Sequence, residues 1–380
     1  MPAPHLSDRE RLGSLRLARS ENVGPITFRQ LLARFGGAEA ALAALPELAK
    51  RGGRGRPLAI CPAAAAEREL AGLARLGGRL IVLGEAGYPT LLAAIDDAPA
   101  VLSLVGRSEL LERRAVALVG ARNASANGRL IAETMARELA ALGWVVVSGL
   151  ARGIDSSAHA GALAGGTIAV LAGGIDKPYP PESEALYRRI MTEGLLVAEL
   201  GLGRLPQARH FPRRNRIVSG LSAGAVVVEA ALKSGSLITA RLAGEQGREV
   251  MAVPGSPLDQ RCRGANQLIR QGAILVESAA DVNEQLSGFG PSPGPQDRPA
   301  PIRHVDMAED DNTLKELPDS AISEVERRLG PSPVPVDELG RQCQLSPPFL
   351  RMTLLELELA GRLQWHPGNR VSLLASAGGD

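Results

Sequence analysis

The sequence predicts an α/β protein with a doubly wound, mostly parallel sheet, preceded by a helical domain and followed by a small winged-helix domain. Between residues 80 and 253, short valine-rich apolar segments alternate with amphipathic helical segments, which is typical of a sheet covered on both faces. Before residue 80, apolar residues recur at helical spacing. Residues 318–380 have the pattern of three short helices and a hairpin, which favours a winged helix.

Residues 1–79 are expected to form the helical domain. Val23-Gly24-Pro25 interrupts the helical pattern with a turn, and a helix carrying Leu31, Leu32 and Phe35 follows. This unit is similar to helix-hairpin-helix modules that hold DNA backbones. A plain helical packing domain is the alternative, because the turn contains no lysine or arginine.

Residues 80–287 are expected to form the sheet domain. One intervening helix should place Ile131, Met135, Leu139 and Leu142 on a single apolar stripe. Ligands of such sheets bind beyond the carboxyl ends of the strands. The expected strands span residues 80–83, 101–105, 115–119, 144–147, 167–171, 195–198, 225–228 and 250–253.

The loops after four of these strands contain glycine, which lets a ligand approach the backbone closely. They span residues 120–123, 149–155, 173–180 and 234–236. Three of them add a cation: Arg122, Arg152 and Lys177. Together they predict a basic, glycine-lined crevice, although any one of them alone is compatible with ordinary turn chemistry.

The segment 211–240 contains the densest set of candidate ligand groups. Phe211 stands beside Arg213, Arg214 and Arg216, and we expect a short helix after these arginines. Guanidinium groups bind phosphate bidentately or stack on bases, and a helix that opens at Ser234 to Ser236 offers free amides to an anion. The alternative is a solvated arginine face and a serine that only caps its helix.

The acidic residue that ends the 225–228 strand, Glu229, is expected to organise the arginines or the loop amides around it. Asp155 is expected to cap a helix, with His159 as a packed or capping residue rather than an acid–base pair.

Composition excludes several classes of protein. Lys and Arg total 43 against 41 acids, so the net charge is only +2, but five arginines and no acid lie between residues 200 and 228, which indicates a local polyanion site. The three cysteines lack ligand or disulfide spacing. We therefore expect no metal, no cofactor, and a reducing cytoplasmic location without membrane segments.

Motifs for two kinds of enzyme are missing or misplaced. There is no Gly-Lys-Ser or Gly-Lys-Thr, so a P-loop is absent. Gly220-Leu-Ser222-Ala-Gly224 matches a nucleophile elbow, but it is expected to follow a helix and to precede a strand, which is the wrong order.

Residues 288–317 are rich in Pro, Gly and acids and are expected to be a linker before the winged-helix domain, 318–380. Its last helix has Arg351 near its start but also Glu356 and Glu358. Because a recognition helix must present donors to a groove, we expect this module to be a protein-contact or regulatory element.

These stretches together resemble the DNA-processing protein A family (DprA, also called Smf). The matching motifs include VGAR at 119–122, SGLARGID at 148–155, FPRRNRIVSGLS from Phe211, VVVEA and SGSLITA, in the family's order. The resemblance implies an extended Rossmann-like fold and a non-catalytic protein that binds single-stranded DNA. It also implies a homodimer that loads RecA recombinase during natural transformation and recombination.

The alternative function class is a nucleotide-processing enzyme of the lysine-decarboxylase-like phosphoribohydrolase type, whose PGGxGTxxE motif is not present.

The candidate contact residues follow from these motifs and loops. Expected dimer contacts are Leu268, Ile269, Ile274 and Leu275, with the alternative that these residues only pack a helix and the last strand of the sheet. Expected DNA contacts are Gly120, Arg122, Asn123, Arg152, Lys177, Phe211, Arg213, Arg214, Asn215, Arg216, Ser234, Gly235 and Ser236.

Overall fold

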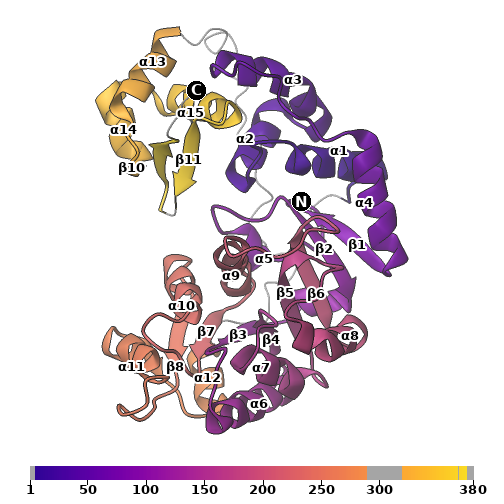
Figure 1. Cartoon of the computed structure of the whole chain (residues 1–380), viewed down its shortest axis with the longest axis vertical. Coiled ribbons are helices and arrows are strands. Elements are labelled where there is room, and N and C mark those ends of the chain that lie inside the picture. The colour runs from indigo at the N-terminus through magenta and orange to yellow at the C-terminus, as the bar shows by residue number, and fades with distance from the viewer. Residues whose placement is uncertain (1–4, 289–318, 367, 375–380) are drawn as a thin grey trace. The chain divides into compact units, whose positions relative to one another are not determined.

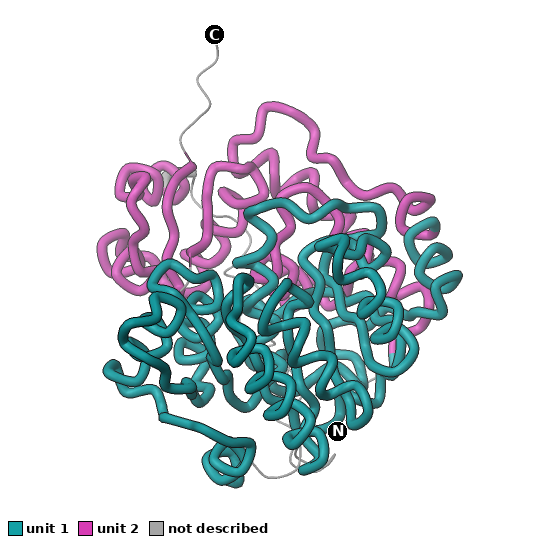
Figure 2. Tube along the Cα trace, turned by 60° about the horizontal axis from the view of Figure 1, so that its bottom comes forward, with its two compact units in different colours: residues 1–5, 68–301 teal, residues 6–67, 302–380 magenta. Residues whose placement is uncertain are grey.

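The computed structural model of the chain describes residues 5–288, 319–366 and 368–374. It divides into two compact units, shown in Figure 2. The first unit contains residues 1–5 and 68–301, and the second contains residues 6–67 and 302–380. The second unit therefore combines two segments, residues 6–67 and 302–380, that are far apart in the sequence. The expected linker, 288–317, lies outside the described residues except for Gly288.

The first unit contains a nine-stranded sheet with the order β1-β2-β6-β5-β4-β3-β7-β8-β9 (Figure 1). The seven strands from β6 to β9 in this order are parallel, and β2 and β1 continue the sheet antiparallel. All eight expected strands and the mostly parallel fold class are confirmed. Strand β9 is not one of these eight and was expected only as the alternative role of Ile274 and Leu275. The bounds are β1 Gly78–Val82, β2 Val101–Gly106, β3 Ala115–Val119, β4 Val145–Ser148, β5 Thr167–Gly174, β6 Leu195–Leu200, β7 Gly224–Val227, β8 Glu249–Ala252 and β9 Ile274–Leu275.

Side chains of the central strands alternate between two hydrophobic cores, one on each face of the sheet. On β4, Val145 and Val147 belong to one core, whereas Val146 belongs to the other. On β3, Leu118 lies on the same face as Val146. Because both faces are covered, the strands are continuously apolar, which explains the pattern in the sequence.

Helices cover both faces of this sheet (Figure 1). Residues of α6, α7 and α12 contribute to one core, and residues of α9, α10 and α11 contribute to the other. The bounds in this unit are α5 Thr90–Ala93, α6 Ala126–Ala141, α7 Ile154–Ala162, α8 Glu184–Glu193, α9 His210–Gly220, α10 Ser236–Glu245, α11 Arg263–Arg270 and α12 Ala279–Leu286, with α4 Ala63–Arg75 at its boundary.

The apolar stripe expected on α6 is half wrong. Met135 and Leu139 are buried, but Ile131 is 36% exposed and Leu142 is 46% exposed. The buried stripe instead includes Ala132 and Ala136. Helices α6 and α7 pack closely against each other, and small side chains allow that approach better than isoleucine or leucine would.

The second unit combines the N-terminal helices with the winged-helix domain. Helix α1 ends at Arg19, and α2 begins with Pro25 in its first turn, which confirms the expected helix, turn and helix. The expected three helices and hairpin of the winged helix are also confirmed. The bounds are α1 Asp8–Arg19, α2 Pro25–Phe35, α3 Ala38–Arg51, α13 Asp319–Arg328, β10 Val334–Pro335, α14 Val336–Cys343, α15 Pro347–Leu359, β11 Leu363–His366 and β12 Arg370–Leu373.

Candidate functional site

The loops that follow the parallel strands lie at one edge of the sheet, because β3 to β8 all run in the same direction. We call this edge the carboxyl-edge surface and define it as residues 120–125, 149–153, 175–183, 201–209 and 228–235, together with the first turn of α9. Backbone hydrogen bonds tie its loops together. Ile154 N donates to Ala121 O at 3.2 Å, and Gly174 N donates to Arg204 O at 2.8 Å. The surface is therefore a connected frame rather than a set of free loops.

Glu229 organises the loop between β3 and α6, which was one of the two roles expected for it. Its buried carboxylate accepts hydrogen bonds from Ser125 N at 2.9 Å and from Ser125 Oγ at 2.6 Å. Ser125 Oγ in turn accepts from Gly128 N and caps α6. At Gly120, an added Cβ would lie 2.8 Å from Glu229 O, so only glycine permits this approach. The hydrogen bonds from Ser125 to Glu229 thus fix the loop that carries Arg122.

Asp155 shapes the loop between β4 and α7. Its Oδ2 accepts from Gly149 N at 3.2 Å and from Ala151 N at 3.3 Å. The expected N-cap role is wrong: Gly153 occupies the N-cap position, and the carboxylate turns back toward the preceding loop. Burial raises the pKa of Asp155, while the nearby Arg214 guanidinium and the loop amides lower it.

His159 is a packed residue, as expected. Its ring lies between the hydroxyl of Thr167, 2.7 Å from Nδ1, and the amide of Leu150, which donates to Nε2 at 3.3 Å. Burial, with a further contribution from Arg214, lowers the pKa of His159 to about 3. The imidazole is therefore neutral and holds the backbone of the 149–153 loop.

Arg214 lies beneath the same loop and is only 6% exposed. Its Nη1 donates to Val170 O at 2.7 Å. An added Cβ at Gly149 would lie 1.8 Å from that nitrogen, so the guanidinium packs directly under the glycine. Burial lowers the pKa of Arg214 to about 10, with Asp155 opposing the shift, so the side chain stays charged at neutral pH.

Glu199, at the end of β6, pairs with two of the other predicted arginines. Its Oε1 lies 3.1 Å from Arg213 Nη2 and 2.6 Å from Arg216 Nη2. Burial alone would raise the pKa of Glu199, but Arg216 and Arg213 together lower it below its ordinary value. Arg216 is buried and also pairs with Asp97, whereas the Arg213 side chain is 50% exposed.

The arginines lie inside α9, which corrects the expectation of a helix after them. Helix α9 begins at His210 and includes the whole Arg213 to Arg216 run. Residues three apart share a helix face, so Arg213 and Arg216 both reach Glu199, while Arg214 points to the 149–153 loop.

Two aromatic rings and one arginine form the outer layer of the site. The guanidinium carbon of Arg122 lies 4.9 Å from the centre of the Phe211 ring. The Tyr179 ring lies 5.7 Å from the Phe211 ring at an angle of 56°. Arg122 and Tyr179 are exposed, and Phe211 is half-buried. Two loops and the first turn of α9 thus bring cation and ring faces together at the surface.

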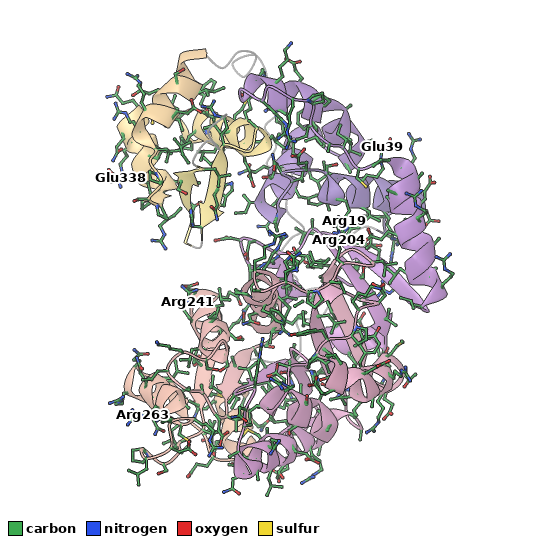
Figure 3. The ribbon with its side chains drawn as sticks, in the orientation of Figure 1. Arg19, Glu39, Arg204, Arg241, Arg263 and Glu338 are labelled. Carbon is green, nitrogen blue, oxygen red and sulfur yellow. The ribbon has the colours of Figure 1, made fainter. Side chains whose placement is uncertain are left out.

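Further cations lie on the same edge. Lys177 is partly exposed and lies 3.4 Å from Asp176, and the exposed Arg152 is 4.0 Å from Glu182. Arg204, which Figure 3 labels, is exposed on the loop after β6, as is Arg209. Asn123 is also exposed.

The Ser-Gly-Ser turn opens α10 as expected, with Ser236 as the first helical residue. The hydroxyls of Ser234 and Ser236 lie 2.7 Å apart, and no side chain caps this helix. The side-chain amide of Asn215 donates to Gly235 O at 3.3 Å, which ties α9 to this turn. The first amides of α10 have acceptors within the turn, since Ser236 N donates to Ser234 Oγ at 3.4 Å and Leu237 N to Ser234 O at 3.1 Å.

The structure thus brings most predicted contact residues to one surface, and turns Arg214 and Arg216 inward. Sequence reasoning missed Tyr179 and Glu199. The Tyr-Pro pair after β5 was visible, but nothing in the sequence placed it beside Phe211. Within the described residues, no group of three or more His, Cys, Asp or Glu side chains is arranged to hold a metal ion. Across those same residues, every helix is too short or too polar to span a bilayer.

The predicted dimer contacts lie at the far edge of the sheet. Leu268 and Ile269 on α11 are partly buried against one core, and Ile274 on β9 packs against the other. Leu275, also on β9, is 49% exposed. Because β9 is the last strand of the sheet, its outer side has no neighbouring strand in the sheet order.

Comparison with protein families gives three matches. The family model described as DNA recombination-mediator protein A matches residues 79–287. The model of a DprA-like N-terminal HHH domain matches residues 8–72, and the model of a DprA winged helix domain matches residues 313–369.

Curated relatives and solved structures agree with these matches. The DNA processing protein DprA of Bacillus subtilis is 45% identical over 222 residues, which cover 58% of this chain and 75% of that protein. Protein Smf of Escherichia coli is 38% identical over 315 residues, 82% of each chain. The crystal structure of DprA from Streptococcus pneumoniae is 34% identical with a TM-score of 0.61, and covers 74% of this chain and 99% of that one. A structure of DNA processing protein A from Helicobacter pylori, described in terms of its single-stranded DNA binding mode, is 31% identical with a TM-score of 0.50, and covers 53% and 94%.

Proposed function

The chain belongs to the DNA recombination-mediator protein A family, and from this premise we propose that its carboxyl-edge surface binds single-stranded DNA and delivers the strand to a RecA-type recombinase. The observation that carries the proposal is the exposed layer of Arg122, Phe211 and Tyr179. Ring faces and guanidinium planes stack on unpaired bases of any sequence, and flanking cations follow the backbone phosphates. The description of the Helicobacter pylori relative supports the same ligand.

The predicted contacts divide into three roles under this proposal. Arg122, Asn123, Arg152, Lys177 and Arg213 meet the strand, since their side chains are exposed or partly exposed. Gly120, Asn215, Ser234, Gly235 and Ser236 shape the backbone around it. Arg214 and Arg216 are buried and hold the loops and α9 in place.

We further propose that the site performs no chemical step. Its three buried acids, Asp155, Glu199 and Glu229, accept loop hydrogen bonds or pair with arginines. The neutral imidazole of His159 is held between Thr167 and Leu150. None of these groups is free to exchange a proton with a nucleotide, which argues against the phosphoribohydrolase alternative.

The test is the salt dependence of binding to a labelled oligonucleotide, measured by fluorescence anisotropy. Each phosphate contact contributes about 0.7 to the slope of log K against log salt for a single strand. Arg122→Ala should therefore weaken binding and reduce the slope by about that amount. Arg137, exposed in the last part of α6, is the matched control and should leave the slope unchanged as Arg137→Ala. An unchanged slope and affinity in Arg122→Ala would overturn the assignment of this surface.

The delivery step needs its own readout. RecA filament assembly on a strand coated with single-strand binding protein should be faster with the wild-type chain than with Arg122→Ala. Turnover of nucleoside monophosphates by the wild-type chain would instead favour the phosphoribohydrolase class.

A further inference from the structure

Helix α15 of the winged-helix domain is buried on two sides. Leu350, Leu354 and Leu357 belong to the core of that domain. Met352, Leu355 and Leu359 are at most 8% exposed, yet they lie outside that core. Within the same unit, α15 packs against α2 and α3 of the N-terminal helical domain. The helix therefore packs both against the core of its own domain and against the N-terminal helices.

Two glutamates of α15 are bound by groups of the N-terminal helices. Glu356 Oε1 lies 2.6 Å from Arg51 Nη2 at the end of α3, and the Glu356 side chain is 1% exposed. The hydroxyl of Thr27 on α2 donates to the Glu358 carboxylate, which also accepts from Trp365 Nε1 at 2.8 Å. Each buried acid thus has specific hydrogen-bond or ion-pair partners, as buried polar groups require.

The backbones also approach closely at this contact. Asn22 Nδ2, in the turn between α1 and α2, donates to Leu359 O at 3.1 Å. An added Cβ on Gly52, just after α3, would lie 2.0 Å from Glu356 O. Only glycine at position 52 leaves room for the backbone of α15 at this distance. The two surfaces are therefore closely complementary, as in a specific interface.

The third helix of a winged helix is the one that enters a DNA groove when such a domain reads DNA. Here, that helix offers carboxylates rather than base-edge donors on its second face, and that face is covered. We propose that α15 is a docking helix for the N-terminal helical domain of the same chain. This contact joins residues 6–67 and the winged-helix domain into one module and withholds the covered face of α15 from nucleic acid.

The inference is independent of the proposed function of the carboxyl-edge surface, which lies in the other unit. Under this proposal, the winged-helix domain is held against the N-terminal helical domain through α15. Any contact of the covered face of α15, which carries Leu355, Glu356 and Leu359, with DNA or another protein would first require release from α2 and α3.

A charge swap in the full-length protein tests this docking. Arg51→Glu places a second acid beside Glu356, and should raise amide hydrogen exchange in α15 by about tenfold if the two domains separate locally. Because Arg51 belongs to the N-terminal domain, an effect read out in α15 reports on the contact rather than on the fold of the winged helix. Arg51→Glu combined with Glu356→Arg should restore protection. The matched control is Arg351→Glu, an exposed position on α15 itself, which should leave exchange unchanged.

Protection of α15 that stays within about twofold of wild type in Arg51→Glu would overturn the proposal. So would protection that is lost on about hundredfold dilution, because a contact within one chain does not depend on concentration, whereas docking onto a second copy does.

Discussion

The guanidinium of Arg122 stacks on the ring of Phe211, with its central carbon 4.9 Å from the ring centre. Arg122 comes from the loop after β3 and Phe211 from the first turn of α9, so the pair joins two segments that are far apart in the sequence. The contact holds the exposed Arg122 side chain against the ring before any ligand arrives. A preorganised cation and ring lose less conformational freedom on binding than free side chains would.

We predict that Phe211→Leu weakens single-stranded DNA binding by about tenfold, which corresponds to about 1.4 kcal/mol. Stacked bases contribute about 1 to 3 kcal/mol each, and leucine keeps apolar volume but removes the ring face for the base and for Arg122. Fluorescence anisotropy at fixed salt measures the change. Leu142→Ala, at a 46% exposed position just after α6 and outside the carboxyl-edge surface, is the control and should bind as wild type. Equal affinities for the two variants would contradict a stacking role.

The fold could be predicted because its signal is local. Alternate valines of β3 and β4 face two cores, so each strand is apolar throughout and stands out against the helices around it. Strand β9 was not among the eight expected strands because two residues, Ile274 and Leu275, are too few to show a period.

The site could be predicted only in part, because the direction of each arginine depends on distant residues. The sequence shows Arg213, Arg214 and Arg216 as one basic run. Their division into exposed and buried groups depends on Glu199 at the end of β6 and on Gly149 after β4. The pairing of Tyr179 with Phe211 likewise exists only in the folded chain.

We predict that Asp155→Ala destabilises the first unit by about 3 kcal/mol, because it leaves Arg214 buried without its nearby acid and two loop amides without an acceptor. Chemical denaturation monitored by circular dichroism measures the free energy of unfolding. Glu182→Ala, at an exposed acid on the same edge, should cost less than about 0.5 kcal/mol. If Asp155→Ala costs no more than Glu182→Ala, the buried network does not stabilise the loop.

The next prediction concerns dimer formation through β9. We predict that the chain is a homodimer through this edge, and that Leu275→Arg converts it to a monomer, since a charge at a 49% exposed apolar position cannot be desolvated in an interface without a partner. Light scattering after size exclusion gives the mass. Leu142→Arg, at a 46% exposed position on the end of α6, is matched in exposure and should remain dimeric. A folded dimer in Leu275→Arg would show that the interface lies elsewhere.

The contact between α15 and the N-terminal helices should weaken as pH rises, because of Glu358. Burial raises the pKa of this carboxyl to about 7, and the hydrogen bonds from Thr27 and Trp365 only partly oppose the shift. Thr27, Trp365 and the Gly24 backbone face it, and none of these three is charged. In the undocked or unfolded chain, the carboxyl should titrate near its ordinary value of 4.5. Between pH 4.5 and about pH 7, separation of α15 from the N-terminal helices is therefore accompanied by release of a proton from Glu358.

The sign follows from this difference in bound protons. Between about pH 4.5 and pH 7 the docked state holds a proton that the open state has lost, so the stability of docking falls as pH rises through this window and levels off above it. Burial also raises the pKa of Glu356, against the opposing effect of Arg51 and Arg34, and this acts in the same direction.

We therefore predict that the urea midpoint of the second unit, followed by the fluorescence of Trp365, is higher at pH 5.5 than at pH 8, and that Glu358→Gln removes most of this difference. Glutamine resembles the protonated carboxyl in charge, so it keeps the contact but no longer titrates. Glu338→Gln, at a partly exposed acid of α14 labelled in Figure 3, is the control and should keep the wild-type dependence. A Glu358→Gln variant whose midpoint still falls with pH as in the wild type would assign the effect to another group, with Glu356 as the first to test, because its carboxyl is buried at the same contact.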